Sequence, residues 1–220
     1  MTMHPCDVVL EAYRDRALPA SSVRAEHHWL KVTCDEAKEK WLRLLRPGDC
    51  EKFTAPAAFM EQHGPCFAYP LSLFGYYLGF ALRAVGSKQM RTFVRHKNVA
   101  SYTAFAGSQG DLPPDGVTVV IVEGYADVEA VARFHPWTVG TMGGQLKVAA
   151  FPIVAAVARK VVLLTDNDRA GERGESVEKK NFELLGRPVV AMKYPEKYKD
   201  PAEWYLGEGD RMGDAIRRNV

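Results

Sequence analysis

The stretch "VVLLTDNDRAGERG", residues 161–174, carries two aspartates directly behind an apolar run. Four apolar residues lead through a threonine to Asp166 and Asp168, and a charged segment with glycines follows. A short apolar run that ends in turn residues is typical of a strand buried on both faces of a sheet. The stretch therefore predicts a buried strand, a turn with two carboxylates, and a helix that starts just after the turn.

Strands and helices alternate along the whole second half of the chain. Apolar runs that end in turn residues predict strands at 117–124, 137–144, 160–166 and 187–195. Apolar residues at helical spacing predict helices at 125–134, 147–160 and 170–186. This alternation predicts an α/β fold, in which a parallel sheet carries helices on both of its faces.

The first half of the chain is less regular and favours a smaller mixed α+β subdomain. Its beginning predicts two helices, at 11–30 and 35–49, and residues 67–86 predict two strands joined around Phe74 and Gly75. The turn-rich stretch "SQGDLPPDG" marks the expected boundary between the halves. The expected domains are therefore an N-terminal subdomain, an α/β domain and a C-terminal helix or tail, at 1–112, 113–206 and 207–220.

Four carboxylates follow predicted strands. They are Glu123, Asp166, Asp168 and Asp200. Ligands of parallel sheets bind outside the carboxyl ends of the strands, so these side chains are expected to meet at one edge. Clustered carboxylates are costly to ionise unless a cation neutralises them, and all-oxygen ligands favour Mg²⁺ or Mn²⁺ over zinc. For the two aspartates at 166 and 168 alone, a solvated turn with an aspartate cap is the alternative.

The overall composition restricts the classes of function only weakly. The 220 residues carry a net charge of +2, so nucleic-acid binding would need a local basic surface. The four cysteines form no C-x-x-C pair, so no zinc is expected. No apolar run is long enough to span a membrane and the N-terminus lacks a signal-peptide pattern, so a cytoplasmic protein without a membrane partner is expected.

One stretch of the first half is basic and free of acidic residues. Between Glu61 and Asp111 there is no aspartate or glutamate. The basic residues of this stretch, 62–110, are Arg83, Lys88, Arg91, Arg95 and Lys97. Binding to a phosphate backbone requires cations without acidic neighbours, so the stretch is a candidate nucleic-acid interface. A basic face that only keeps the protein soluble is the alternative.

Three motifs in order resemble the Toprim domain of bacterial and phage DnaG-type primases. They are "EGYADV", "DNDRAG" and "DPAEWYL", which begin at Glu123, Asp166 and Asp200. The segment "VGTMGGQL" is similar to the glycine-containing turn that this domain has between the first two motifs. The resemblance implies a Rossmann-like Toprim sheet and, more faintly, a primase core that extends upstream into the basic stretch.

The resemblance also implies roles for individual residues. It implies that Glu123 is a catalytic carboxylate that assists proton movement and contacts metal, and that Asp166 and Asp168 are catalytic metal ligands. Asp200 would be a further metal ligand. Supporting roles fall to Asp127, Gly124 and Gly171, although a helix-start aspartate is the alternative for Asp127. The five basic residues and Arg169 would bind DNA or nucleotide phosphates.

The implied function is that of a DNA-dependent RNA primase. Such an enzyme joins ribonucleoside triphosphates on a single-stranded DNA template, with two or more Mg²⁺ or Mn²⁺ ions, in a bacterial cell or a phage-infected host. A replicative helicase is a further candidate partner. A Toprim nuclease and a non-catalytic nucleic-acid-binding module are the alternatives. If Asp168 binds metal, Asp168→Asn is expected to abolish activity and to leave folding intact or stabilised.

Overall fold

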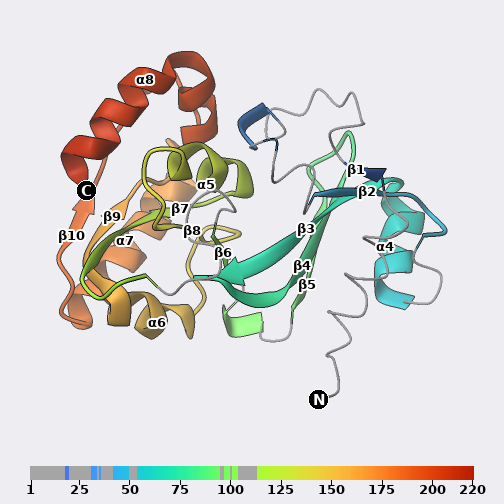
Figure 1. Cartoon of the computed structure of the whole chain (residues 1–220), viewed down its shortest axis with the longest axis horizontal. Coiled ribbons are helices and arrows are strands. Elements are labelled where there is room, and N and C mark those ends of the chain that lie inside the picture. The colour runs from blue at the N-terminus through green and yellow to red at the C-terminus, as the bar shows by residue number, and fades with distance from the viewer. Residues whose placement is uncertain are drawn as a thin grey trace.

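The structure is a computed structural model with two sheets that lie beside each other (Figure 1). The residues it describes are 18–19, 31–33, 35, 42–49, 54–94, 97–99, 101–103 and 113–220. One sheet is antiparallel, in the order β1-β2-β3-β4-β5, and comes from the first half of the chain. The other has the order β10-β9-β7-β8-β6 and comes almost entirely from the second half.

The second sheet confirms the predicted α/β fold. Its parallel strands are β7 (Val117–Val122), β8 (Thr138–Gly140), β9 (Ala158–Leu163) and β10 (Val189–Ala191). A short antiparallel edge strand, β6 (Tyr102–Thr103), pairs with β8 and was not predicted. The central strand β7 is almost wholly buried, as its continuous β-branched sequence requires, and its neighbour β9 is buried over its last three residues, 161–163.

Helices cover both faces of this sheet, as predicted (Figure 1). On one face lie α5 (Tyr125–Ala132) and α8 (Pro201–Asn219), which contact each other along their lengths. On the other lie α6 (Ala150–Val157) and α7 (Arg169–Leu184). The rings of Phe151 and Phe182, 5.0 Å apart between centroids, join this second pair.

The strand order has a switch point beside β7. The chain passes from β7 to β8 on one side, and then returns to place β9 on the other side. At such a point the two connections leave in opposite directions, and a crevice forms outside the carboxyl ends of the strands. Glu123 directly follows β7 and Asp166 follows β9, so both residues lie at this crevice.

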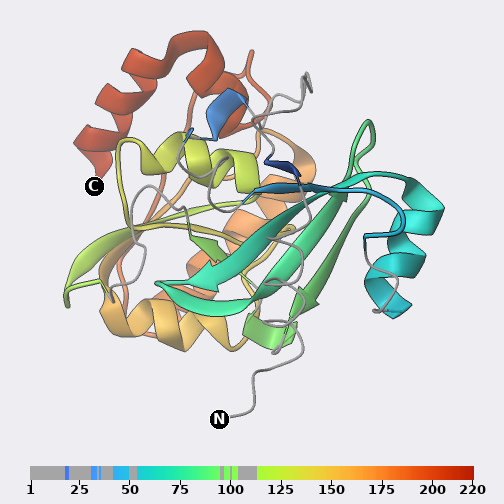
Figure 2. The ribbon, with the colours of Figure 1, turned by 45° about the vertical axis from the view of Figure 1, so that its right-hand side comes forward.

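The antiparallel sheet is buried on both faces at its centre, whereas one of its edges is partly exposed. Its strands are β1 (Leu18–Pro19), β2 (Arg43–Leu45), β3 (Cys66–Leu73), β4 (Tyr76–Ala84) and β5 (Met90–Val94). Along β3, Phe67 and Tyr69 face the core shared with the parallel sheet, whereas Cys66 and Ala68 face a second cluster. The helix α4 (Thr54–His63) covers that second cluster, at the far end of the molecule from α6 (Figures 1 and 2).

The predicted pair of strands at 67–86 is confirmed as the hairpin of β3 and β4. Its two turn residues are Phe74 (φ 47°) and Gly75 (φ 75°), which are both left-handed. Such a two-residue turn matches the right-handed twist of the strands it joins. The tyrosine rings of Tyr69 on β3 and Tyr125 on α5, 4.3 Å apart, pack the two sheets together beside the crevice.

Several predicted boundaries are wrong. Leu18–Pro19 and Arg43–Leu45 are strands rather than helix, because β1 pairs with β2 and β2 pairs with β3, and this pairing overrides the local helical pattern. Most of the other residues of those two predicted helices lie outside the described part. The helix predicted at 147–160 ends at Val157, and β9 begins at the next residue. The predicted domain bounds stay predictions; α8 extends across residue 206, the expected end of the α/β domain, and has a kink at Glu208. No described helix is long and apolar enough to cross a membrane.

Candidate active site

The end of β7 presents Glu123 and then turns directly into α5. Gly124 is the N-cap of α5, and its backbone N–H donates to Asp127 Oδ2 at 2.8 Å. A Cβ at Gly124 would lie 2.8 Å from that same oxygen, so a glycine is required for the close approach. The other oxygen of Asp127 accepts from the Ala202 N–H at 3.1 Å. Asp127 is buried, and its two carboxylate oxygens connect the start of α5 to the start of α8.

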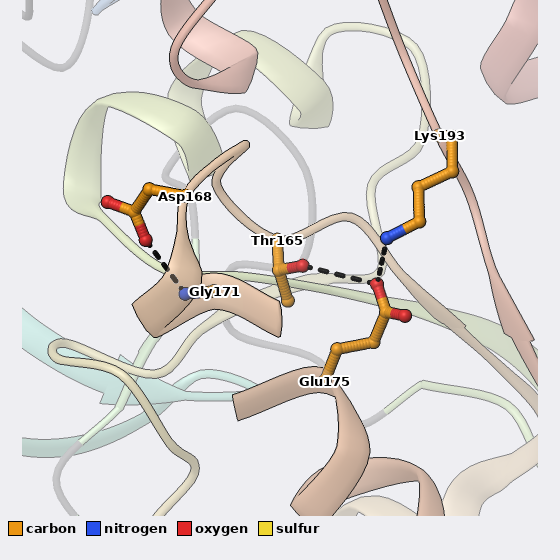
Figure 3. Close-up of polar contacts among 5 residues, drawn as sticks. All are labelled: Thr165, Asp168, Gly171, Glu175 and Lys193. Atoms are coloured by element: carbon orange, nitrogen blue, oxygen red, sulfur yellow. Dashed lines mark hydrogen bonds and ion pairs between the residues drawn. The ribbon is translucent and has the colours of Figure 1, made fainter. Parts of the chain in front are cut away.

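The end of β9 presents the two aspartates in different environments. Asp166 is half-buried, whereas Asp168 is exposed and is the N-cap of α7. Asp168 Oδ1 accepts from the Ala170 N–H at 2.8 Å and from the Gly171 N–H at 2.9 Å (Figure 3). A Cβ at Gly171 would overlap the carbonyl oxygen of Asp166, so this glycine lets the helix start against the turn. The aspartate cap considered as an alternative is thus present, but at Asp168 only.

Asn167, between the two aspartates, was not singled out from the sequence. Its backbone N–H donates to the Lys199 carbonyl oxygen at 2.9 Å, and its Nδ2 donates to the Tyr198 carbonyl oxygen at 2.9 Å. These bonds hold the segment before α8 against the turn after β9. As a result, Asp200 comes to the crevice as the N-cap of α8, where it accepts from the Glu203 N–H at 2.8 Å. Its position is a helix start rather than the predicted strand end.

The fold brings the four predicted carboxylates together, and their charges shift the pKa values of Glu123 and Asp166. Burial raises the pKa of Asp166 to about 7, and the charges of Glu123, Asp200 and Asp168 add to the rise. Burial and the charge of Asp168 also raise the pKa of Glu123. The pKa of Asp168 is lowered, because the N–H groups of Gly171 and Ala170 stabilise its ionised form. Unlike Asp168, Asp166 and Glu123 therefore resist ionisation in the metal-free protein.

Burial also raises the pKa of Asp127 well above its usual value, and the charges of Asp200 and Asp166 add to this. The ammonium group of Lys199 acts in the opposite direction on three of the site carboxylates, because it lowers the pKa values of Glu123, Asp166 and Asp168. Lys199 stands directly before Asp200, and its position next to the third motif is the signal that could have identified it. Among the described residues, it is the cation whose charge acts on the pKa values of these acids.

Two buried oxygens of the site have no hydrogen-bond partner among the described residues. They are Glu123 Oε1 and Asp166 Oδ1. Unpaired buried carboxylate oxygens are costly, and together these acids form an all-oxygen donor set of the kind that Mg²⁺ and Mn²⁺ accept. Among the described residues, no three acidic, histidine or cysteine side chains lie close enough to hold an ion by themselves. The donors thus fit an ion that keeps several water or phosphate oxygens as ligands, as Mg²⁺ commonly does.

A second network supports the turn after β9 (Figure 3). Glu175 of α7 accepts from Lys193, just beyond β10, at 2.8 Å and from the hydroxyl of Thr165 at 3.4 Å. Thr165 is the buried residue before Asp166. The glutamate therefore links the ends of β9 and β10 to the helix, and restrains the residue that leads into the acidic turn.

The predicted basic residues lie apart from the carboxylates in the fold. Arg83 is on β4, Lys88 is exposed in the turn after it, and Arg91 is exposed on β5, all in the antiparallel sheet. The guanidinium of Arg91 lies 5.6 Å from the ring centroid of Phe93. The charge of Arg83 acts on the buried Tyr69, where it partly offsets the rise in pKa that burial causes. Arg83 thus interacts with the interior, whereas Lys88 and Arg91 face solvent.

The remaining predicted cations are only partly described. Arg95 and the side chain of Lys97 lie outside the described residues, although the backbone at Lys97 begins a short 3₁₀ helix (Lys97–Val99). Arg169 is exposed on the first turn of α7, one residue beyond Asp168. It is the one predicted cation that the described structure places beside the acidic turn.

Comparison with known proteins identifies the fold that carries this site. The Toprim-like family matches residues 120–205, which include all four carboxylates. This segment of the chain is similar to the Toprim-like family. Comparison with curated protein sequences finds no significant match. The arrangement of Glu123 and the two aspartates around the switch point is thus part of a Toprim-like sheet rather than of another α/β fold.

Solved structures extend the likeness to most of the chain. The Aquifex aeolicus primase, with its zinc-binding and RNA polymerase domains, superposes with a TM-score of 0.71 at 18% identity and covers 97% of this chain. A DnaG primase catalytic domain bound to single-stranded DNA gives 0.70 at 15% identity and also covers 97%. The primase fragment of the bacteriophage T7 primase-helicase gives 0.52 at 19% identity, over 67% of this chain.

These matches establish the primase-core fold for both sheets of the chain, including the antiparallel sheet that the sequence resemblance reached only faintly. This chain spans 60% of the Aquifex aeolicus chain, 78% of the DnaG domain and 61% of the T7 fragment. At identities below 20%, the likeness is one of fold.

Proposed function

We propose that this protein is a DNA-dependent RNA primase, which joins ribonucleoside triphosphates on a single-stranded DNA template by metal-dependent nucleotidyl transfer. The observation that carries the proposal is the pair of buried, unpartnered oxygens, Glu123 Oε1 and Asp166 Oδ1, at the switch point of a Toprim-like sheet. The primase-core fold of the whole chain supports it.

Glu123, Asp166 and Asp168 would hold Mg²⁺ or Mn²⁺, in two or more sites, with Asp200 as a further ligand. A bound ion would neutralise these acids and stabilise the charge that develops on the phosphate. The raised pKa of Glu123 suits a carboxylate that receives a proton from an attacking hydroxyl, because a base works best when its pKa approaches the working pH. The side chains of Asp127 and Asn167 form hydrogen bonds to backbone groups. These bonds connect the loop after β7 and the loop after β9 to the segment where α8 begins.

Lys88 and Arg91 would bind the template, because both are exposed on the antiparallel sheet in the acid-free part of the sequence. Arg169, beside the acidic turn, would bind a nucleotide phosphate, and Arg83, Arg95 and Lys97 complete the proposed basic set. We also propose that the protein acts in the cytoplasm of a bacterial cell or a phage-infected host, with a replicative helicase as partner. The primase domain of a T7 primase-helicase has the same core fold.

The test is a single assay with purified protein, single-stranded DNA, labelled ribonucleoside triphosphates and Mg²⁺ or Mn²⁺, beside a Glu123→Gln variant. New short labelled oligoribonucleotides that are absent with the variant are the expected result. Shortened template in place of new product would assign the metal site to a nuclease. Retention of DNA with neither product would overturn both readings in favour of a binding module.

A further inference from the structure

One stripe of α7 lies against both loops of the candidate site. The buried residues of this helix are Gly171, Gly174, Glu178 and Phe182. A Cβ at Gly171 would overlap the carbonyl oxygen of Asp166, and a Cβ at Gly174 would overlap that of Gly144. The helix therefore contacts the backbone of the loop after β9 and also the backbone of the loop after β8.

Glu178 occupies a position on this stripe where an apolar residue is expected. Its side chain is 1% exposed, and its Oε1 accepts from the Leu146 N–H at 2.8 Å. Its Oε2 is buried and has no hydrogen-bond partner among the described residues. A half-satisfied buried carboxyl group stabilises a protein less than an apolar side chain of similar size would. A gain in stability therefore does not explain a glutamate at position 178. Its hydrogen bond to the Leu146 N–H indicates a role in fixing the loop to which Leu146 belongs.

The loop that Glu178 contacts has a conformation that needs support. Three successive residues have positive φ: Met142 at 57°, Gly143 at 130° and Gly144 at 51°. For a methionine this conformation is strained, and such strain persists only where the surroundings fix it. The Met142 N–H donates to the Glu123 carbonyl oxygen at 3.0 Å and fixes the start of the loop. The bond from Leu146 to Glu178 fixes its end.

The same loop reaches the catalytic candidate. The hydroxyl of Thr141 and the N–H of Met142 both donate to the Glu123 carbonyl oxygen, at 3.5 Å and 3.0 Å. A chain of contacts therefore runs from Glu178 through Leu146 and the turn at 142–145 to the backbone of Glu123. Gly174 packs α7 directly against Gly144, in the middle of this turn.

We propose that Glu178 is a positioning residue for Glu123. Its hydrogen bond to the Leu146 N–H holds the turn at 142–145, which includes Gly144, in its strained form, and this form keeps the Met142 N–H on the Glu123 carbonyl oxygen and so fixes the direction of the Glu123 side chain. The proposal rests on the proposed function only in so far as Glu123 is the metal-binding catalytic carboxylate. Glu178 itself touches neither substrate nor metal.

The experiment compares Glu178→Met and Glu178→Gln with Glu183→Gln, an exposed charge removal on the same helix. Methionine fills the space without an acceptor, whereas glutamine keeps an acceptor for Leu146. Amide hydrogen exchange by NMR at Leu146 and Gly144, and Mn²⁺ binding by calorimetry, are measured for each. In the methionine variant we expect exchange about tenfold faster at both amides and Mn²⁺ binding about tenfold weaker. Both glutamine variants should match the wild type.

Unchanged amide exchange, or unchanged Mn²⁺ affinity, in a folded Glu178→Met protein would overturn the proposal. A Glu178→Gln protein that differs from the wild type in amide exchange or in Mn²⁺ affinity would also overturn it. If the methionine variant does not fold, Glu178→Asp replaces it, because the shorter side chain withdraws the acceptor and keeps the charge. Absence of Mn²⁺ binding by the wild type would overturn the metal-dependent function instead. In that case exchange at Leu146 and Gly144 alone decides the positioning role.

Discussion

The two sheets of this chain hold their charged side chains in different ways. In the parallel sheet the acids converge, because parallel strands end at one edge and the turns after them are fixed by caps and close glycine contacts. In the antiparallel sheet the predicted cations are spread over β4, β5 and the turn between them. The acidic site therefore depends on backbone geometry, whereas the basic surface depends on summed charge. A single substitution should reduce function strongly in the acidic site and only weakly on the basic surface.

The largest expected difference between the two regions is in catalysis. Glu123→Gln should reduce primer synthesis by about 10²–10⁴-fold, because it removes a carboxylate that receives a proton and binds metal. Lys88→Ala, an exposed change in the other sheet, should reduce it only a few-fold through weaker template binding. Initial rates at a template concentration below saturation measure both. Equal losses in the two variants would contradict the contrast drawn between the sheets.

Two glycines, one in each region, give a matched test of backbone geometry. A Cβ at Gly171 would overlap the Asp166 carbonyl oxygen, and a Cβ at Gly79 on β4 would overlap the Phe93 carbonyl oxygen. Each alanine variant should lose about 1–3 kcal/mol of unfolding free energy from overpacking. Only Gly171→Ala should also weaken Mn²⁺ binding, because it displaces the acidic turn. Urea unfolding and calorimetry at a temperature where both variants are folded would separate the two effects.

The strand-end rule explains why the parallel half could be predicted from its sequence. Apolar runs that end at Glu123 and before Asp166 determine both the strands and the edge where the acids meet. The same rule could not place Asp200, which reaches the crevice only because Asn167 bonds to the segment before α8. Nor could it find Glu178, whose partner Leu146 is far away in sequence and belongs to a loop. Such contacts depend on tertiary packing that no local pattern contains.

The antiparallel half was harder to predict because both faces of its sheet are buried at the centre. Residues of β3 alternate between two cores, so the strand has no polar face to reveal its period. The hairpin was still found, since Gly75 interrupts the apolar run at its turn. The segment Arg43–Leu45 was mistaken for helix, because so short a strand is specified by its neighbours β1 and β3 more than by its own sequence.

The two aspartates of one turn should respond to pH in opposite directions. Because the pKa of Asp166 rises from 3.8 to about 7 on folding, its ionisation destabilises the metal-free protein progressively above pH 4 and fully above pH 7. Asp166→Asn should therefore gain about 1–2 kcal/mol at pH 8, after allowance for its partial exposure, and nothing at pH 3. Thermal melts in EDTA at both pH values measure this.

Asp168→Asn should leave the fold intact, which is one of the two outcomes expected from the sequence, but it should not stabilise the fold. The pKa of Asp168 is lowered on folding, so its ionised form contributes stability at neutral pH that is lost only as pH falls below about 4. Asparagine also caps helices well, so the variant should lose about 0.3–1 kcal/mol at pH 8 through the lost charge at the helix start. The substitution that relieves repulsion between the carboxylates is Asp166→Asn instead. A gain in stability for Asp168→Asn would contradict this division of roles.

The smallest expected effects belong to the basic surface. Lys88→Ala and Arg91→Ala should each weaken binding of single-stranded DNA a few-fold and lower the slope of log affinity against log salt by about 0.7, the value for one phosphate contact. Arg91→Ala should cost more than Lys88→Ala, because its guanidinium lies against Phe93, which stacks on Phe80 and offers an aromatic face. Arg218→Ala, an exposed loss of charge near the end of α8, is the matched control. If all three variants shift the slope equally, net charge alone governs binding and the antiparallel sheet has no dedicated template path.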